Sequence, residues 1–564
     1  MLREINIFFI LVSMMIKVTP CLGQWSTEPG INLQICNWAL PPFSATTDSA
    51  GGIYIAVTKE YYDPNHPAEG QRHQYLFKID KSGYLSWPAP IEIRGLGEWS
   101  DHIQLIPDNR GGVIAGFVDM VLIGKKETRP LWDYKVRVQK IDSDGNLLWG
   151  NGIQAIADTC DQPYFNIISD NDGGCFTSVI VDMKFQFDDS DDRSQILQHI
   201  SLNGEQLWGE DGRLVADTVM DYYNCKPFQI ILGQNDDIIV QSTRFNTNPR
   251  EHLIRRFDLE GNLIWTIPTR FDWFDMNILP SKNDGIFIVG FKEMGNSNWI
   301  LGIDRITSNG AFYWDSVQTV IDSVGTESGL TKSMLFNNEN ILIYWWNSEH
   351  VFIQKINFMG QSLFNGLGLL PHPYQSYGRE MLLSEDNFIV TDGFFAQKFN
   401  SSGQPLWDED GLYFSSTPRD MEIVISDMNG GFISTWEWNL NGVWAQQVSK
   451  NGKLGEVLTH INFDENTPIP NSIHLEQNFP NPFNNSTTIR FFTSCSGKAK
   501  IQIFDLAGNQ TKVIEISVSS PGTYNLALLL SELPSGIYFY TLKFYDKNDR
   551  LITKTNTYKM VLLK

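Results

Sequence analysis

Several features that would point to a familiar chemistry are scarce or missing in this sequence. Only 6 of the 564 residues are cysteine, and no two of them form a CxxC pair, which argues against metal binding through sulfur and against dithiol redox chemistry. The chain contains no HExxH, GxSxG or GxxxxGK[ST] motif. We therefore predict no catalytic residue and no resident cofactor, although a pair of glycosidase carboxylates is set by spatial separation and leaves no linear motif.

Positive charge is also in short supply. The chain has 43 Lys and Arg against 65 Asp and Glu, a net charge of −22. A nucleic-acid partner is therefore excluded, because phosphate binding requires a basic face. The deficit is uneven: residues 474–564 carry 10 basic and 6 acidic side chains, so this tail is +4 and the rest is −26. Such an asymmetry indicates a second module.

Long hydrophobic runs are absent beyond the N-terminus. Arg3 precedes an apolar run from Ile5 to Ile16, which is too short to span a bilayer and is typical of a signal peptide. We predict a signal peptide over residues 1–23, with lipidation at Cys21 as an alternative that Pro20 disfavours. We expect an exported chain that is not an integral membrane protein.

Turn and strand residues, by contrast, are abundant. Aromatic residues make up 13% of the chain and charged residues only 19%, and there are 45 glycines, a composition that favours an all-β fold. A strand followed by a glycine turn recurs eight times, and in seven of these repeats an aromatic residue stands four positions after the glycine, as in KIDSDGNLLW and FDLEGNLIW. The turn glycines are Gly83, Gly145, Gly204, Gly261, Gly310, Gly360, Gly403 and Gly452, and the aromatic residues of seven repeats are Trp87, Trp149, Trp208, Trp265, Trp314, Phe364 and Trp407.

A second element alternates with the first, a polar turn that leads into a β-rich run, as in PDNRGGVIAGF. Two hairpins per repeat of about fifty residues predict one four-stranded sheet per repeat, which is the blade of a β-propeller. We predict a propeller over residues 24–462 with eight blades, and seven as the alternative.

The repeat resembles the tryptophan-docking motif of eight-bladed quinoprotein dehydrogenases, in which the indole packs between neighbouring blades. The resemblance implies a structural role for the seven aromatic residues. The turn here is shorter by about one residue, and the adjacent cysteines that alcohol-oxidising members place beside their quinone are missing. Quinone binding is therefore not carried over.

After a linker at residues 463–473, residues 474–564 show a different pattern. LEQNFPNPFNNSTTIRF, IQIFDLAGN, LPSGIYFYTL and the terminal KMVLLK occur in this order, and together they resemble the C-terminal sorting domain of the type IX secretion system. The resemblance implies an immunoglobulin-like β-sandwich and delivery by that machinery to the cell surface or the medium across the outer membrane. The motif residues are Asn478, Pro480, Asn481, Pro482, Phe483, Gly508, Gly536, Tyr538, Lys559 and Lys564, of which the two lysines are candidates for recognition.

A few residues outside the repeats could bind a ligand. Asp188, Asp189, Asp191 and Asp192 could hold calcium through their carboxylates, although an exposed acidic loop is the usual explanation of such a cluster. Trp99, Trp132 and Trp273 are expected on loops, where they could stack on sugars. Asp101 and His102 are adjacent, which in a regular strand would point them to opposite faces. Cys160 and Cys225 could form a disulfide between neighbouring repeats, or remain small buried residues.

Three functions fit these observations. The first is a non-catalytic binding or scaffold module that takes a glycan or a protein at the propeller face. The second is a hydrolase or lyase that acts on a polysaccharide, and the third is a quinoprotein-like oxidoreductase. We favour the first, because no nucleophile, base and electrophile are brought together by any motif.

Overall fold

The chain folds into two compact units, a large unit over Ser26–Gly455 and a C-terminal unit that contains Glu456–Lys564. All regular elements of the described residues are strands, which confirms the prediction of an all-β chain. The computed structural model describes residues 25–563 except 28–31, 62–70, 98, 127–128, 158–163, 183–192, 217–228, 234, 245–250, 271–272, 282–284, 294–298, 322–328, 338–339, 347–350, 365–367, 370–378, 385, 393–394, 409–410, 416–420, 438–441, 456–461, 465–472, 480, 484–485, 519–521, 531–532 and 547–549.

The large unit consists of four-stranded antiparallel groups, numbered here as sheets 1 to 8. Arg72 and Trp99 form one parallel pair that also joins sheets 1 and 2. The first four sheets contain β2 (Leu40–Thr47), β3 (Ile53–Tyr61), β4 (Gln71–Ile79) and β5 (Ile91–Ile93); β6 (Trp99–Pro107), β7 (Val113–Lys126), β8 (Arg129–Ile141) and β9 (Ile153–Gln154); β10 (Tyr164–Ser169), β11 (Cys175–Asp182), β12 (Arg193–Ile200) and β13 (Arg213–Ala216); and β14 (Ile230–Leu232), β15 (Ile238–Arg244), β16 (Glu251–Phe257) and β17 (Leu263–Pro268).

The remaining four sheets repeat this order, and the last one is completed by the strand that begins the unit. They contain β18 (Trp273–Ser281), β19 (Gly285–Glu293), β20 (Trp299–Ile306) and β21 (Gln318–Ile321); β22 (Gly329–Phe336), β23 (Asn340–Trp346), β24 (Val351–Asn357) and β25 (Gly368–Leu369); β26 (Arg379–Ser384), β27 (Asn387–Asp392), β28 (Phe395–Phe399) and β29 (Leu412–Tyr413); and β30 (Met421–Ser426), β31 (Phe432–Glu437), β32 (Val443–Val448) and β1 (Leu33–Cys36).

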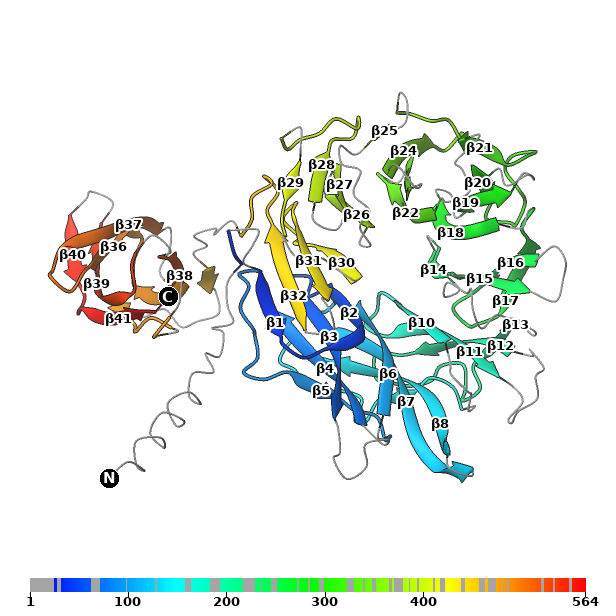
Figure 1. The fold of residues 1–564 in the computed structure, drawn as a ribbon, viewed down its shortest axis with the longest axis horizontal. Helices are drawn as coiled ribbons and strands as arrows, with labels where there is room; N and C mark the ends of the chain where they lie inside the picture. The colour runs from blue at the N-terminus through cyan, green and yellow to red at the C-terminus, as the bar shows by residue number, and fades with distance from the viewer. Residues whose placement is uncertain are drawn as a thin grey trace, which may run out of the picture. The chain divides into compact units, whose positions relative to one another are not determined.

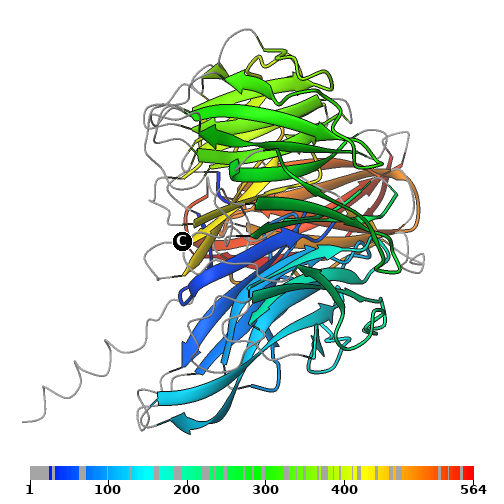
Figure 2. The same ribbon diagram turned by 90° about the vertical axis from the view of Figure 1, so that its right-hand side faces the viewer.

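The first strands of successive sheets lie side by side. β2 contacts β6, and the contacts continue through β10, β14, β18, β22, β26 and β30 back to β2. The colour order in Figure 1 follows the same succession. The sheets therefore follow one another around the large unit in the order of the sequence, and the long β7–β8 hairpin projects at one end (Figure 1, Figure 2).

Apolar side chains fill the space between neighbouring sheets. Tyr54 and Trp87 of sheet 1 cluster with Phe117 of sheet 2, and corresponding clusters join sheets 2 to 8 in pairs. A single four-stranded sheet is too small to bury both of its faces, so its stability depends on its two neighbours.

The glycine turns have the predicted backbone, but the segment after them differs from the prediction. All eight turn glycines have φ between +71° and +90°, a region that favours glycine. In seven sheets the segment beyond the turn forms only one isolated bridge, such as Ile141 with Leu147, rather than a strand. In sheets 1, 2, 3, 5, 6 and 7 the chain leaves the sheet edge there to place its aromatic residue and forms the outermost strand only later, whereas the outermost strand of sheet 8 is β1. In sheet 4, β17 runs through Trp265 without this interruption.

The C-terminal unit pairs two antiparallel sheets around one core. Leu475, Ile489, Ile501 and Tyr540 are among the buried residues that both sheets contribute. The sheets are β33 (Asn462–Asp464), β38 (Gly522–Leu529), β35 (Ser486–Thr493) and β34 (His474–Leu475), and β37 (Gln510–Val518), β36 (Gly497–Phe504), β39 (Gly536–Tyr545) and β40 (Leu551–Lys554) with β41 (Tyr558–Leu562) beside β39. β33 begins within one residue of the segment predicted as a linker and pairs with β38.

Candidate functional site

The repeated aromatic residues join each sheet to the next. Trp149 Nε1 donates a hydrogen bond to the carbonyl oxygen of Leu202, 3.2 Å away in the following repeat. The same bond runs from Trp208 to Leu259 and from Trp265 to Ser308, at 3.1 and 3.0 Å. Trp407 donates in the same way to Lys450 at 3.1 Å. These side chains are used by the fold and are not available as a ligand platform.

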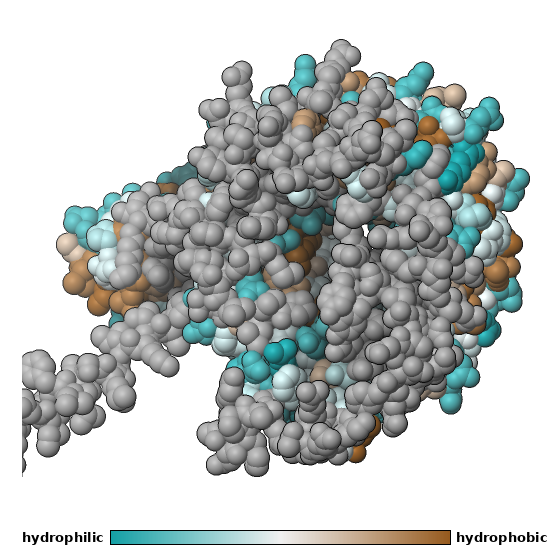
Figure 3. Space-filling view, turned by 45° about the vertical axis from the view of Figure 1, so that its right-hand side comes forward, coloured by the Kyte–Doolittle hydropathy of each residue, from teal (hydrophilic) through white to brown (hydrophobic). Residues whose placement is uncertain are grey.

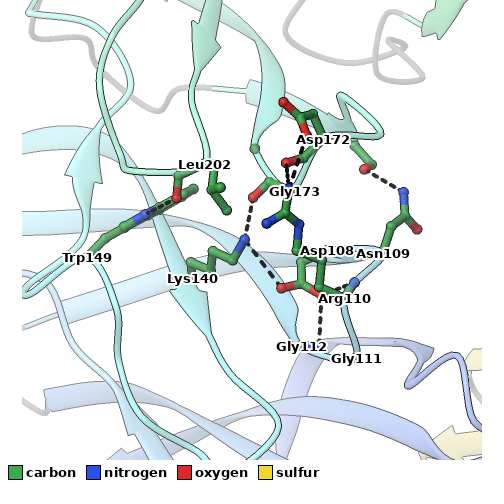
Figure 4. A network of polar contacts seen from close by, with 12 residues as sticks. Asp108, Asn109, Arg110, Gly111, Gly112, Lys140, Trp149, Asp172, Gly173 and Leu202 are labelled. Carbon is green, nitrogen blue, oxygen red and sulfur yellow. Dashed lines mark hydrogen bonds and ion pairs between the residues drawn. The ribbon is translucent and has the colours of Figure 1, made fainter.

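A buried lysine between the polar turns of sheets 2 and 3 strengthens the contact between these two sheets. Lys140 Nζ lies 3.3 Å from Asp108 Oδ2 and donates to the carbonyl oxygen of Gly173 at 2.5 Å (Figure 4). Asp108 Oδ1 meanwhile accepts from the amides of Arg110 and Gly112, at 2.8 and 2.7 Å. The corresponding turn aspartates Asp48, Asp170 and Asp427 each accept hydrogen bonds from two backbone amides. These acidic side chains therefore stabilise the turns.

Sequence reasoning missed a repeated glutamine that belongs to the same arrangement. Gln139 Oε1 accepts from the amides of Lys140 and Trp149, both at 3.0 Å. A glutamine ten residues before the aromatic residue makes the matching pair of bonds in three other sheets, at Gln198, Gln354 and Gln397. The recurring letters QKI, QHI and QKF at these positions are the signal that could have revealed it.

The opposite end of sheet 1, away from the glycine turns, carries a group of aromatic and charged side chains. Lys59 Nζ lies 4.7 Å from the ring centroid of Trp38, 4.6 Å from that of Tyr61 and 6.0 Å from that of Tyr75. The rings of Trp38 and Tyr75 meet edge to face at 5.3 Å. No carboxylate of the described residues forms an ion pair with Lys59, and its ammonium group lies over the faces of these rings.

A carboxylate in the same group contacts an imidazole and a guanidinium group. Glu92 Oε1 lies 2.6 Å from His73 Nδ1 and 2.7 Å from Arg94 Nε. Partial burial opposes the charge of Glu92, but the hydrogen bonds and charges of Arg94 and His73 outweigh it and hold the pKa of the carboxyl below its usual value. Together with Trp38, Lys59, Tyr61 and Tyr75 these three residues form the Lys59 cluster.

The other face of the β3–β4 hairpin contacts sheet 2 through Trp99, one of the tryptophans that were predicted to stack on sugars. The Arg72 guanidinium lies 5.1 Å from the Trp99 ring, whose centroid is 5.8 Å from that of Trp132. Both tryptophans lie on strands rather than on loops, which corrects the prediction. We call Arg72, Trp99, Trp132, Asp101 and His102 the Trp99 cluster.

Asp101 and His102 are closer together than the strand pattern predicted. The pairing of β6 with β7 shifts between Asp101 and Gln104, and His102 has φ +48°. This bulge lets His102 N donate to Asp101 Oδ1 at 2.9 Å and places His102 Nδ1 3.8 Å from Asp101 Oδ2. The expectation of opposite faces is therefore wrong, because the bulge interrupts the two-residue period.

Trp273, another predicted binding residue, is not brought to this end. Trp273 begins β18 and its side chain is only 2% exposed, so the prediction of a loop platform is wrong for it. Asp188, Asp189, Asp191 and Asp192 lie outside the described residues, as do residues 1–23 and Cys160 and Cys225. Within the described part of the chain, no group of three or more His, Cys, Asp or Glu side chains could hold a metal ion, and no helix is long and apolar enough to cross a membrane.

Exposed polar and apolar side chains are mixed on the part of the large unit that Figure 3 shows. The Lys59 cluster differs from a purely apolar patch, because Tyr61 and Arg94 combine ring surface and charge at 37% and 62% exposure. Aromatic faces pack on apolar surface while carboxylate, imidazole and guanidinium groups form hydrogen bonds. The arrangement suits recognition of a ligand that has both kinds of surface.

Most residues of the predicted sorting motif stabilise the C-terminal unit. Asn478 is 2% exposed, and Phe483 is 1% exposed in the core. Asn481 Nδ2 donates to the carbonyl oxygen of Lys559 at 2.9 Å, while Asn481 Oδ1 accepts from Val561 N at 2.8 Å. Gly508 has φ +87° at a turn, and Pro482 follows a cis peptide bond. Gly536 and Tyr538 lie on β39, and Lys559 lies on β41. Pro480 and Lys564 lie outside the described residues.

Comparison with known proteins finds a family model that matches the tail. Residues 477–554 match the family model described as the secretion system C-terminal sorting domain, which confirms the predicted resemblance of the tail. The match implies that the chain is exported by the type IX machinery to the cell surface or the medium. No curated protein sequence matches the chain.

Solved structures resemble the chain only distantly. A puromycin-hydrolysing peptidase of Mycobacterium tuberculosis has 8% identity and a TM-score of 0.39, with 74% of this chain and 61% of the peptidase covered. A protein of unknown function from Dyadobacter fermentans has 12% identity and a TM-score of 0.33, covering 56% and 93%. Prolyl oligopeptidase B of Galerina marginata has 10% identity and a TM-score of 0.37, covering 81% and 55%. The chain thus spans less than two thirds of either peptidase, and similarity at this level says nothing of activity.

Proposed function

We propose that this protein is an exported binding module, an eight-bladed β-propeller carried to the cell surface by an immunoglobulin-like sorting domain, and that the Lys59 cluster binds a glycan. Eight four-stranded groups, the contacts among their first strands and the pairing of β1 with β32 support the blade count. The two packed sheets of the C-terminal unit support the sandwich.

The observation that carries the binding proposal is the Lys59 ammonium held over three aromatic rings beside a Glu92–Arg94 ion pair. Ring faces offer stacking surface to the C–H groups of a sugar, and the Glu92 and Arg94 side chains offer hydrogen bonds to its hydroxyl groups. Because Lys59 and Arg94 outnumber Glu92, the cluster favours a glycan that carries carboxylate groups.

A glycan array with the full exported chain tests the proposal. We expect binding to glycans that contain uronic acids, weaker binding of neutral ones, and no release of products. Tyr61→Ala and Lys59→Met should each reduce binding about tenfold, the effect of truncating a residue at the centre of an interface. Tyr413, a tyrosine of sheet 7 that is 50% exposed, provides the matched control Tyr413→Ala, which should bind normally.

Two results would contradict this function. Unchanged binding by Tyr61→Ala would place the ligand elsewhere on the molecule. Cleavage of a polysaccharide would instead favour the hydrolase or lyase, with His73 and Glu92 as the first acid and base pair to replace, since they lie 2.6 Å apart.

A further inference from the structure

The sorting motif contains one large side chain that the fold does not use. Phe479 is 80% exposed, the largest exposed fraction of any large hydrophobic residue in the described part of the chain. Its neighbour Asn478 is buried and donates from its amide to Tyr540 Oη at 2.5 Å and from Nδ2 to Thr487 Oγ1 at 2.8 Å. An apolar ring therefore projects outward directly beside a buried asparagine.

The backbone of Phe479 is fixed in place despite this exposure. Its amide donates to the carbonyl oxygen of Thr488 and its carbonyl oxygen accepts from the Thr488 amide, both at 2.9 Å. On either side, Gln477 Nε2 and Asn481 Nδ2 donate to the same carbonyl oxygen of Lys559, at 2.8 and 2.9 Å. A side chain on such a rigid support loses little further entropy when a partner binds it.

The chemistry of this position fits a protein partner. Leaving a phenylalanine ring in water forgoes the favourable free energy that its burial would supply. The same amount becomes available when an apolar pocket of a partner covers the ring, and aromatic anchors of this kind often dominate protein interfaces. Lys559 and its exposed side chain lie next to the Phe479 segment, so a carboxylate beside the pocket would complete the match.

We propose that Phe479 is the apolar anchor by which the export machinery holds the C-terminal unit, in an apolar pocket bordered by a carboxylate. This inference rests on the proposed export of the chain. It assigns recognition to a residue that the motif pattern alone did not single out, and it leaves Asn478, Asn481 and Phe483 as residues that position the anchor.

Surface display of full-length variants in the native host tests the inference. We expect Phe479→Ala to reduce the amount at the cell surface at least about tenfold, with accumulation in the periplasm. Phe479→Trp should retain display, because it preserves an aromatic anchor. Leu506 is 72% exposed on the same unit, so Leu506→Ala is the matched control and should be displayed normally.

Two further measurements separate the inference from its premise. The purified Phe479→Ala chain should unfold at the wild-type temperature, and a lower one would overturn the inference by giving the ring a role in the fold. Normal display of Phe479→Ala beside periplasmic retention of a chain that lacks Leu475–Lys564 would overturn the inference alone. Normal display of the truncated chain would overturn the proposed export function together with it.

Discussion

The indole ring of Trp149 lies against the turn glycine of the next repeat, Gly204. A Cβ atom built on Gly204 would come within 3.0 Å of Trp149 Cδ1, while Trp149 Nε1 bonds to Leu202 two residues earlier. The same contact recurs from Trp87 against Gly145 to Trp407 against Gly452. The glycine thus serves both its own turn and the neighbouring tryptophan.

Gly204→Ala should therefore destabilise the large unit for two reasons. Alanine at φ +82° is strained by about 1–2 kcal/mol, and its methyl group would crowd the indole. Gly111→Ala separates the two effects, since Gly111 has φ +88° but no atom within 4 Å of the added Cβ. Thermal unfolding should show a larger loss for Gly204→Ala, and equal losses would mean that the tryptophan contact contributes nothing.

The indole hydrogen bond can be tested by itself. Trp149→Phe keeps most of the apolar contact and leaves the Leu202 carbonyl without its donor, so we expect a loss of about 1 kcal/mol in the free energy of unfolding. Trp149→Ala should cost about 3–5 kcal/mol, because it also opens a cavity. Chemical unfolding of both variants measures the difference, and similar losses would assign the whole effect to the hydrogen bond rather than to packing.

Lys140 and Lys355 occupy the same position of two repeats but have different partners. Lys140 pairs with the buried Asp108, whereas Lys355 donates to the carbonyl oxygen of Ser401, at 2.8 Å, and lies over the Phe336 ring. Lys140→Met should cost about 3–5 kcal/mol, since it leaves a buried carboxylate without its cation. Lys355→Met should cost about 1 kcal/mol, and a comparable loss in both variants would refute the role of Asp108.

The lowered pKa of Glu92 predicts an acid-dependent stability. A carboxyl whose pKa is lower in the folded than in the unfolded chain stabilises the fold above the unfolded value of 4.5, and this contribution is lost as pH falls through the folded pKa. Glu92→Gln should thus be less stable than wild type at pH 7, by about 0.5 kcal/mol because the pair is partly exposed, and the gap should close below pH 4.5.

Melting temperatures of wild type and Glu92→Gln, measured from pH 7 to below pH 4.5, check the prediction. Glu205 is an exposed glutamate of a glycine turn, and Glu205→Gln should track wild type at every pH. A gap for Glu92→Gln that persisted unchanged into acid would show that the effect is not electrostatic.

Asn481→Ala tests the attachment of the last strand. The substitution removes the bonds to Lys559 and Val561 that hold β41, and we expect a loss of about 1–3 kcal/mol from the C-terminal unit. Limited proteolysis should then release the end of the chain, while Asn509→Ala, which changes only an exposed turn, should leave it protected. Equal protection of both variants would contradict the role of Asn481.

The repeat, the glycine turns and the family resemblance of the tail could all be predicted from local sequence patterns. A glycine turn and the aromatic residue after it lie within a few residues of each other, so their chemistry can be recognised locally. The order of four motifs across residues 475–564 likewise identified the sorting domain. The role of each residue in these motifs could not be predicted in the same way. Whether Asn481 binds β41, and whether Phe479 faces solvent, depends on how the C-terminal unit packs.

The pairing that joins the last sheet to the first strand, and the position of the candidate site, could not be predicted from local patterns. Both depend on contacts between segments that are far apart in the sequence. Leu33 pairs with Ala445, and a contact over such a separation is fixed by the number and the twist of the intervening sheets rather than by nearby residues. The residues of the Lys59 cluster follow no regular interval in the sequence, since Trp38, Tyr61, Tyr75 and Glu92 come from different segments of the chain. Asp101 and His102 meet because one bulge breaks the strand period, and the free energy of that bulge is set by packing that no local pattern encodes.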